Sequence, residues 1–476
     1  HHQHDRTKPD RRNARKPSMT PPAHAARRFA HHALTTRYED LSDDAVAQAK
    51  VFILDTFGVG IAGSTAHGAD QLASANDGWG IGTGATLWGR RDRATASGAA
   101  LLNAFQVHCQ EYDCVHEGAV LHPLATTLPA AIACAERQGG VSGRDLLTAV
   151  AIGVDIAAGL GVASRSAMRF FRPATAGGFG ATAAVARLMR LDEDRLVSAF
   201  GIQYAQTSGT LQPHVEGSVT LPLQVAVNCR SALQSADLSR AGLVGPQDVF
   251  EGVYGYLRLF EGEWDLTGVL ASLGQSWRIA ELSHKPYPAG RATHAGIEGI
   301  LTLWQQHRFK TDEVEKITIV GPPITARLCS RPDVPDPSPN YARLCMAYIA
   351  AKVLLYGEID LAHYRGPALT DPETHRLAQR IVMLSDNNTD PNALVPVEVT
   401  IALTTGQTLH WRCEAMLASP GRRLTRDQHL TKFRRCWEFA HAPMPDSQRE
   451  SLIDMVDHLD SVADIRTLTP LLSPTT

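Results

Sequence analysis

The sequence has no closely spaced cysteine pair of the CxxC type, although it holds eight cysteines. Cysteine-rich zinc sites and disulfide frameworks both depend on regular cysteine spacing, so the sequence favours neither. Scattered thiols are typical of proteins in a reducing compartment. We therefore expect a cytoplasmic protein without disulfide bonds.

The sequence also has little excess of charge of either sign, with 46 lysines and arginines against 49 aspartates and glutamates. Proteins that bind nucleic acid usually carry a strongly basic surface, so we expect no nucleic-acid partner. We find no apolar run of the roughly 18–20 residues that cross a bilayer, and expect no membrane partner. An apolar content of 44% is ordinary for a globular protein, and 476 residues exceed one hydrophobic core.

The first 18 residues, HHQHDRTKPDRRNARKPS, are basic and almost without apolar side chains. They lack the apolar segment of a signal peptide. We interpret residues 1–18 as a disordered, tag-like leader or a translated upstream region, with Met19 as a candidate start.

The periodicity of apolar residues changes near residue 310. Before it, Ala- and Leu-rich segments with helical spacing follow one another, and strands do not alternate with helices. After it, residues 314–320 and 397–403 alternate as strands do, residues 407–414 resemble a hairpin partner, and residues 342–356 and 372–382 favour helices. Helical spacing then returns. We expect a helical domain over 19–282 and 420–476, with an α+β lid domain over 283–419.

Carboxylates and imidazoles gather in residues 110–129, QEYDCVHEGAVLHPLATTLP. Both side-chain types can be tuned to exchange protons near neutral pH. The run follows an apolar helix over 94–108, so we expect it to line a cleft. A polar surface loop is the alternative interpretation.

A second segment, HKPYPAGRATH over 284–294, concentrates positive charge in a loop stiffened by two prolines. Lys285, Arg291 and His294 would repel one another in an empty site, and an anion would relieve that repulsion. We expect this segment and residues 110–122 to close on one small anion. The alternative is a basic surface turn before a helix over 292–306.

Two cofactor patterns are present only in part. Residues 178–183 match G-x-G-x-x-A, but no strand precedes them and a long Ala-rich helix follows, which disfavours a dinucleotide site. A metal hydrolase using His108, Glu111, His116 and His122 is a further reading, although the HExxH spacing is absent. We expect no metal and no organic cofactor.

Several segments resemble, in order, the signature motifs of the MmgE/PrpD family. YDCVHEGAVLHP resembles a DFDDTH-type segment that leads into G-x-V-x-H-P, and HKPYPAGRATH resembles K-P-Y/F-P-x-C-R-x-x-H. The further matches are LDTFGVGIAGS, FRPAT, SGT, EGSVTLPLQVAVNC and ARLCMAYIAAKVLLYGEI. The family includes 2-methylcitrate dehydratases, cis-aconitate decarboxylases and iminodisuccinate epimerases. The resemblance implies a mainly α fold, with a large all-helical domain plus a smaller α+β lid domain, and usually a homodimer.

The sequence departs from the family pattern near the implied site. Arg172 stands where an active-site histidine is usual, and Leu221 and Gln224 stand for a lysine and a histidine. Glu111, Cys114 and Val115 also differ from the residues typical of the family. The departures imply a retained class of chemistry with a different small acid as substrate.

The family's reactions begin when a proton leaves a carbon next to a carboxylate, or when a carboxylate departs. The resemblance thus implies a cofactor-independent lyase that dehydrates a small hydroxy-polycarboxylate such as 2-methylcitrate. Decarboxylation, epimerisation, and a non-catalytic binding protein with the same fold are the alternatives. Which residue is base and which is acid stays open. The expected catalytic residues are Asp113, His116, His122, Lys285 and Tyr348, and the expected substrate-binding residues are Glu111, Arg172, Arg291 and His294.

Overall fold

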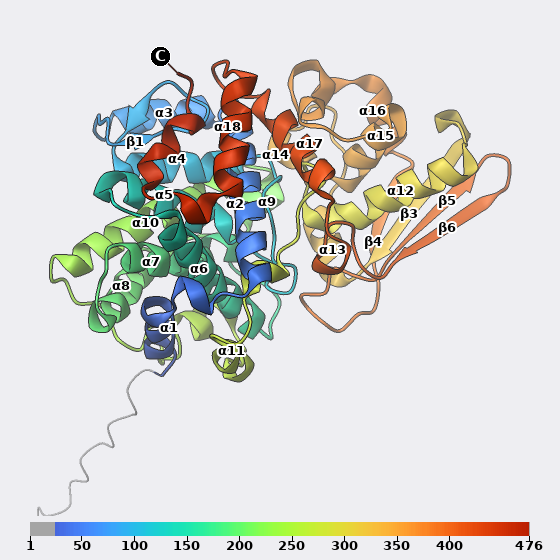
Figure 1. Cartoon of the computed structure of the whole chain (residues 1–476). Coiled ribbons are helices and arrows are strands. Elements are labelled where there is room, and N and C mark those ends of the chain that lie inside the picture. The colour runs from blue at the N-terminus through green and yellow to red at the C-terminus, as the bar shows by residue number, and fades with distance from the viewer. Residues whose placement is uncertain (1–23, 476) are drawn as a thin grey trace, which may run out of the picture.

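The computed structural model describes residues 24–475, so the leader predicted at residues 1–18 lies outside the described part of the chain. The fold is mostly helical with one small sheet domain, in agreement with the fold class expected from the sequence (Figure 1).

The helical part begins with helices whose starts are fixed by polar caps. The Ser42 hydroxyl accepts from the backbone N–H of Ala45, and Ser142 forms a capping box with Asp145. The helices are α1 (His24–Thr35), α2 (Asp43–Gly63), α3 (Ala69–Asp77), α4 (Ala96–His108), α5 (Leu124–Gln138), α6 (Gly143–Ala163), α7 (Arg172–Leu188), α8 (Glu193–Gln206), α9 (Gln212–Glu216), α10 (Thr220–Arg240) and α11 (Thr267–Ser272). Two short strands, β1 (Ala85–Thr86) and β2 (Arg93–Ala94), pair between α3 and α4.

Glycines let the central helices approach backbone to backbone. A Cβ atom at Gly180 of α7 would lie 2.3 Å from the carbonyl oxygen of Gly153 in α6. The G-x-G-x-x-A match over 178–183 lies inside α7, so it forms no phosphate-binding turn after a strand.

Two helices have the length and mean hydropathy of membrane spans, although Asp55 and Asp155 interrupt their apolar residues. They are α2 and α6, each of 21 residues. However, 72% and 94% of their most apolar windows are buried inside the protein. Packing against neighbouring helices therefore accounts for their composition.

The α+β part is built on a four-stranded sheet in the order β4-β3-β5-β6. The strands predicted near 314–320, 397–403 and 407–414 are confirmed as β3 (Val314–Gly321), β5 (Val397–Leu403) and β6 (Thr408–Cys413). The helix predicted over 372–382 is wrong at its end: α16 (Pro372–Ala378) stops, and β4 (Ile381–Ser385) pairs parallel with β3. The apolar run IVML suits a buried strand as well as a helix. Its pairing with β3 makes it a strand.

Helices cover the sheet and connect it to the rest of the molecule. They are α12 (His294–His307), α13 (Pro323–Cys329), α14 (Pro339–Ala342), α15 (Met346–Tyr356) and α16. Helix α12 packs on β5 and β6, and Figure 1 shows it lying along the sheet. The single helix predicted over 342–356 is instead broken, because Cys345 is extended with φ −107° and ψ 101°.

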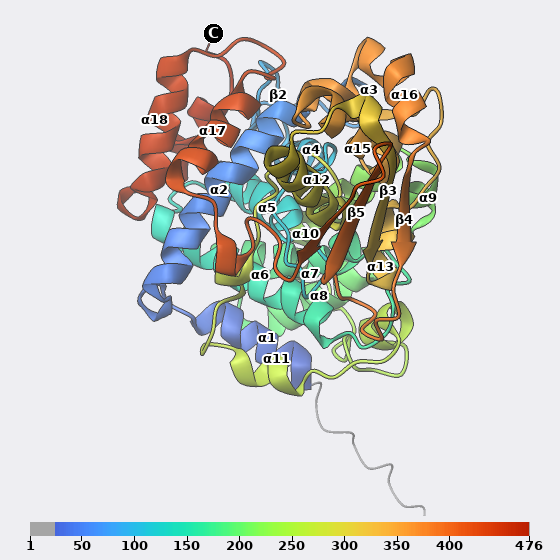
Figure 2. The same ribbon diagram turned by 90° about the vertical axis from the view of Figure 1, so that its right-hand side faces the viewer.

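The last two helices, α17 (Arg426–Trp437) and α18 (Asp446–Asp457), return to α2 at the other end of the sequence (Figures 1 and 2). Lys432 of α17 forms a buried ion pair with Asp55 of α2 at 2.8 Å. The two connections to the α+β part lie side by side, since the His284 N–H donates to the Ala418 carbonyl at 3.1 Å.

Candidate active site

An antiparallel bridge joins the two polar segments singled out in the sequence. The backbone N–H of Val115 donates to the Ser283 carbonyl at 3.0 Å, and that of Ser283 donates back at 2.8 Å. The bridge brings Lys285 to Glu111, where its ammonium lies 2.8 Å from a carboxylate oxygen and 3.2 Å from the backbone carbonyl. The two distant segments meet as expected.

The backbone of Glu111 is in the left-handed region, with φ 51°. Residues other than glycine adopt this conformation at a cost in free energy. Val120 does the same with φ 53°, although it is β-branched. Both residues line one small buried cavity. Strain of this kind persists where the surroundings impose it, often at functional sites.

This inner cavity has a volume of about 60 Å³ and lies where the helical part meets the α+β part. Four polar residues contribute to its wall: Glu111, His122, His214 and Arg291. The remaining wall is largely apolar and comes from both parts of the chain, with Val115, Val120, Met168, Phe171, Pro173, Gly290, Ala292, Leu328, Cys329, Leu344 and Leu394.

Behind His122 lies a buried cluster with Asp113 and His108. His108 Nδ1 is 3.1 Å from an Asp113 carboxylate oxygen, and His122 Nδ1 is 3.5 Å from the same atom. The two imidazoles meet edge to face, with centroids 4.8 Å apart. His108, at the end of α4, entered the sequence analysis only as a possible metal ligand, although it is the direct partner of Asp113.

Burial and charge set the two histidines of this cluster apart. Burial lowers the pKa of His122 to about 4, although the Asp113 carboxylate opposes this effect. For His108, burial also acts to lower the pKa, but Asp113 outweighs it and holds the value above the usual one. His122 is thus a neutral imidazole near pH 7, beside a histidine that keeps its proton more readily.

The hydrogen bonds of His122 define its tautomer. Its Nδ1 lies 3.1 Å from the Cys114 carbonyl, which can only accept, so the ring proton is on Nδ1. Nε2 then carries a lone pair, and within residues 24–475 no hydrogen-bond partner contacts it. A lone pair on a neutral imidazole is what a general base requires.

Potential metal ligands gather in two places within the described chain. His108, Asp113 and His122 present ligand atoms within 4.8 Å of one another, as do Asp55, His284 and His429. His116 belongs to neither group, so the four-residue metal set considered from the sequence is not assembled.

Arg291 lines the inner cavity, but its charge is paired. Its Nε and Nη2 donate to Glu117 Oε1 at 3.1 and 2.7 Å. Its Nη1 donates to His294 Nδ1 at 3.2 Å, and His294 Nε2 donates to the Ala289 carbonyl at 3.0 Å. His294, predicted to bind substrate, therefore lies behind Arg291 and orients it.

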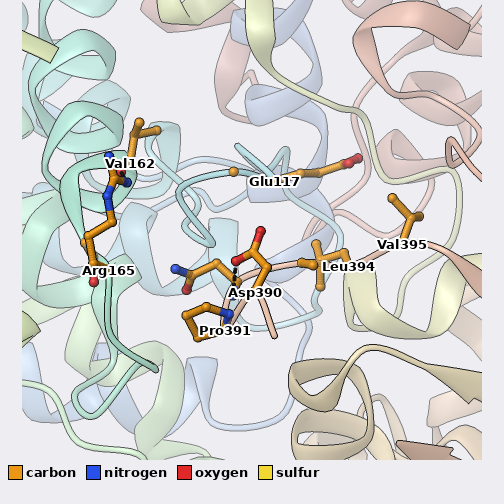
Figure 3. A pocket seen from close by; sticks show the side chains of 11 residues that line it. Glu117, Val162, Arg165, Asp390, Pro391, Leu394 and Val395 are labelled. Atoms are coloured by element: carbon orange, nitrogen blue, oxygen red, sulfur yellow. Dashed lines mark hydrogen bonds between the residues drawn. The ribbon is translucent and has the colours of Figure 1, made fainter. Parts of the chain in front are cut away.

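A larger outer pocket of about 670 Å³ adjoins the inner cavity. Figure 3 shows it between Glu117, Val162 and Arg165 of the helical part and the loop over 390–395. Leu394 lines both spaces, and Glu117 faces the outer pocket while it holds Arg291. The outer pocket and the inner cavity are thus separated by few side chains, among them Leu394 and the pair of Glu117 with Arg291.

Arg172, predicted to hold a carboxylate of the substrate, points elsewhere. It is fully buried and forms an ion pair with Glu261 at 3.0 Å. Its Nη1 donates to the Ala119 carbonyl at 2.7 Å, and Nη2 lies 3.3 Å from Ser164 Oγ. Because neighbouring protein groups occupy the guanidinium, this geometry gives no support to the predicted contact with a substrate carboxylate.

His116 and Tyr348, predicted to be catalytic, also lie outside the cavity wall. His116 Nε2 contacts the Glu281 carboxylate at 2.6 Å, and Nδ1 accepts from the backbone N–H of Ala119. The Tyr348 hydroxyl lies 2.6 Å from the His363 carbonyl. Both side chains hold local structure, and the predicted catalytic roles find no support in this geometry.

His214 was missed by the sequence analysis, although it lines the cavity. It stands alone in LQPHVEG, outside every motif considered. Nearby Leu221 is buried, and the side-chain amide of Gln224 bonds both backbone groups of Thr210. Both side chains are uncharged, so neither replaces the cation that the family pattern has here. Only the folded arrangement brings His214 opposite the polar loop.

Comparison with known proteins gives matches along almost the whole chain. Residues 27–269 match the MmgE/PrpD N-terminal domain, and residues 287–460 match the MmgE/PrpD C-terminal domain. A cis-aconitate decarboxylase-like protein, oryM of Aspergillus oryzae, is 27% identical over 481 residues, covering 95% of this chain and 98% of that protein. Cis-aconitate decarboxylases of Mus musculus and Homo sapiens are each 25% identical, covering 91% of this chain and 90% and 91% of those proteins. The chain belongs to the MmgE/PrpD family.

Proposed function

We propose that this protein is a lyase that acts on a small acid with two or more carboxylates, and that it decarboxylates a substrate of the cis-aconitate type. The observation that carries the proposal is His122, which lines the cavity together with Glu111 and Arg291 and whose Nε2 has no hydrogen-bond partner among residues 24–475. The names of the relatives support decarboxylation over the dehydration expected first from the sequence.

Decarboxylation asks three things of such a site. The C–C bond to the departing carboxylate breaks and CO₂ leaves, so its electron pair remains on the substrate and a proton must be added to carbon. The site has to hold the other carboxylates, stabilise the charge that develops, and supply that proton.

Arg291 lines the cavity, and Lys285 lies behind the cavity residue Glu111; each cation is paired with a glutamate in the free protein. A substrate carboxylate would compete with Glu111 or Glu117 for them. The charge of the substrate would also raise the pKa of His122 from about 4, because an adjacent anion favours the imidazolium. Binding would thus load His122 with a proton that it can deliver to carbon.

The test is turnover of cis-aconitate, 2-methylcitrate and citrate, with CO₂ release and the products followed by NMR. We expect CO₂ release from cis-aconitate, and a loss of at least about 100-fold in His122→Gln. His307→Phe, at an exposed histidine that ends α12, is the control and should keep wild-type activity.

Water loss from 2-methylcitrate without CO₂ release would favour dehydration. Full turnover by His122→Gln would remove the proposed role of that residue. Binding of cis-aconitate without turnover of any acid would favour the non-catalytic alternative.

We also propose that the protein is a homodimer and that it is located in the cytoplasm, as expected from the sequence. Sedimentation of the purified protein at two concentrations tests the first, and fractionation of cells that express it tests the second.

A further inference from the structure

His214 is the one histidine of the inner cavity that comes from outside the polar loop. It lies in the short helix α9, and only 6% of its surface is exposed. It shares the cavity wall with His122 and Glu111. A buried imidazole on a cavity wall needs a partner for each ring nitrogen, or a ligand that provides one.

Arg331 supplies the partner for one ring nitrogen. Its Nη2 lies 3.1 Å from His214 Nδ1 and 2.8 Å from the His214 carbonyl. A guanidinium can only donate, so Nδ1 must be the accepting, unprotonated nitrogen. Arg331 is itself held over the ring of Tyr341, at 4.9 Å from its centroid.

The neutral ring of His214 therefore carries its proton on Nε2. This atom has no hydrogen-bond partner among residues 24–475. His122 shows the opposite arrangement, because its proton is on Nδ1 and its lone pair is on Nε2. The cavity thus has one imidazole that can accept a proton and another that can only donate a hydrogen bond.

We propose that His214 is a substrate-contacting hydrogen-bond donor, which stabilises negative charge on a substrate oxygen, and that Arg331 is its positioning residue. The role rests on the proposed function above. Burial and the adjacent Arg331 lower the pKa of His214 to about 4, so the ring stays neutral at pH 7. A neutral donor fixed in place needs no rearrangement as charge develops, which is the condition for oxyanion-type stabilisation.

The kinetic test compares two substitutions at one position. His214→Phe keeps a ring but removes the donor, and we expect kcat on cis-aconitate to fall about 100- to 1,000-fold. His214→Gln keeps an N–H and should recover at least about tenfold of that loss. Thermal unfolding of each variant checks that it is folded. His214→Phe with activity within about threefold of wild type would overturn the inference.

A second measurement determines which ring nitrogen of His214 carries the proton. Long-range proton–nitrogen correlation of the labelled protein should show His214 protonated on Nε2 and not on Nδ1. In Arg331→Met we expect both tautomers, and a changed pH profile of kcat, whereas Arg331→Lys should retain part of the wild-type behaviour. A fixed tautomer in Arg331→Met would overturn the positioning role.

Adding cis-aconitate separates this inference from the proposed function. A shifted His214 signal without turnover would reject the proposed reaction and support the donor role. Turnover with an unmoved His214 signal would support the proposed reaction and reject the donor role. Failure of cis-aconitate to bind would overturn both.

Discussion

Glu111 and Lys285 bury opposite charges at a point where each depends on the other. Burial acts to raise the pKa of Glu111, but Lys285 together with His108 and His122 more than offsets this effect, so the carboxylate stays ionised. We expect Lys285→Met to lower the free energy of unfolding by about 3–5 kcal/mol, because it leaves a buried carboxylate without a cation. Urea unfolding at pH 7.5 measures this change.

The double variant Lys285→Met with Glu111→Gln is the matched control. It should be more stable than Lys285→Met alone, since no unpaired charge remains. Equal stability of the two variants would show that the ion pair does not hold this part of the site.

Glu117 occupies Arg291 from the side of the outer pocket. Glu117→Gln should release the guanidinium for a substrate carboxylate and lower the Kd for cis-aconitate about fivefold, which corresponds to about 1 kcal/mol. Ser283→Ala is the control: Ser283 Oγ donates to Glu117 at 2.7 Å, and this variant keeps the carboxylate. Calorimetry measures both. Weaker binding by Glu117→Gln would mean that the carboxylate orients Arg291 for the ligand.

At the scale of residues, the sequence showed the right segments but not the direction of each side chain. Asp113, His122 and Lys285 come together because they lie on the loop and the strand-like segment that the bridge joins. The ion pair of Arg172 could not be foreseen, because its partner Glu261 is 89 positions away and no local pattern reveals such a pair. His214 has the same difficulty, since its neighbours at the cavity come from distant segments.

At the scale of elements, the contact between α6 and α7 makes a sharp prediction. Gly180→Ala places a methyl group against the Gly153 carbonyl, a backbone atom that cannot move aside. We expect a loss of about 2–3 kcal/mol in the free energy of unfolding. Gly268→Ala in α11, where a Cβ meets no atom within 4 Å, should be neutral or stabilising by up to about 1 kcal/mol. Denaturant unfolding measures the free energy of unfolding of both variants. Similar values for the two would contradict the close approach of α6 and α7.

Elements with clear periodicity could be predicted, and the errors have local causes. The alternation in β5 leaves Val397, Val399 and Ile401 buried, as the pattern indicates. β4 was merged with α16 because a short apolar run fits either structure until its neighbour is known. Helix α6 has the apolar length of a membrane span, and 94% of its most apolar window is buried inside the protein, as suits a helix of the core.

At the scale of the whole molecule, buried histidines make stability depend on pH. Burial lowers the pKa values of His122 and His214 to about 4 and that of His429 to about 3, and it holds the pKa values of His284 and His294 well below the usual one. Since each would titrate near 6.5 when unfolded, the unfolded state binds more protons below that pH. Stability should fall from pH 7.5 to 5.5, by about 1.4 kcal/mol for each group. His108 works in the opposite direction, because its raised pKa adds stability at low pH.

Urea unfolding at pH 7.5, 6.5 and 5.5 measures this trend. His214→Gln removes one titrating group and should reduce the fall in stability between pH 7.5 and 5.5 by about 1.4 kcal/mol. Stability that rises toward pH 5.5 would show that the carboxylate-paired histidines dominate.

The hydrogen bond between His284 and Ala418 has a mechanical consequence. The sheet-bearing segment leaves and rejoins the helical part of the chain at neighbouring positions, so its two covalent connections are held together there. We expect any opening of this segment toward a substrate to bend the chain at these two connections. Lys285 follows His284 directly, so it should then be displaced less than the loop over 390–395.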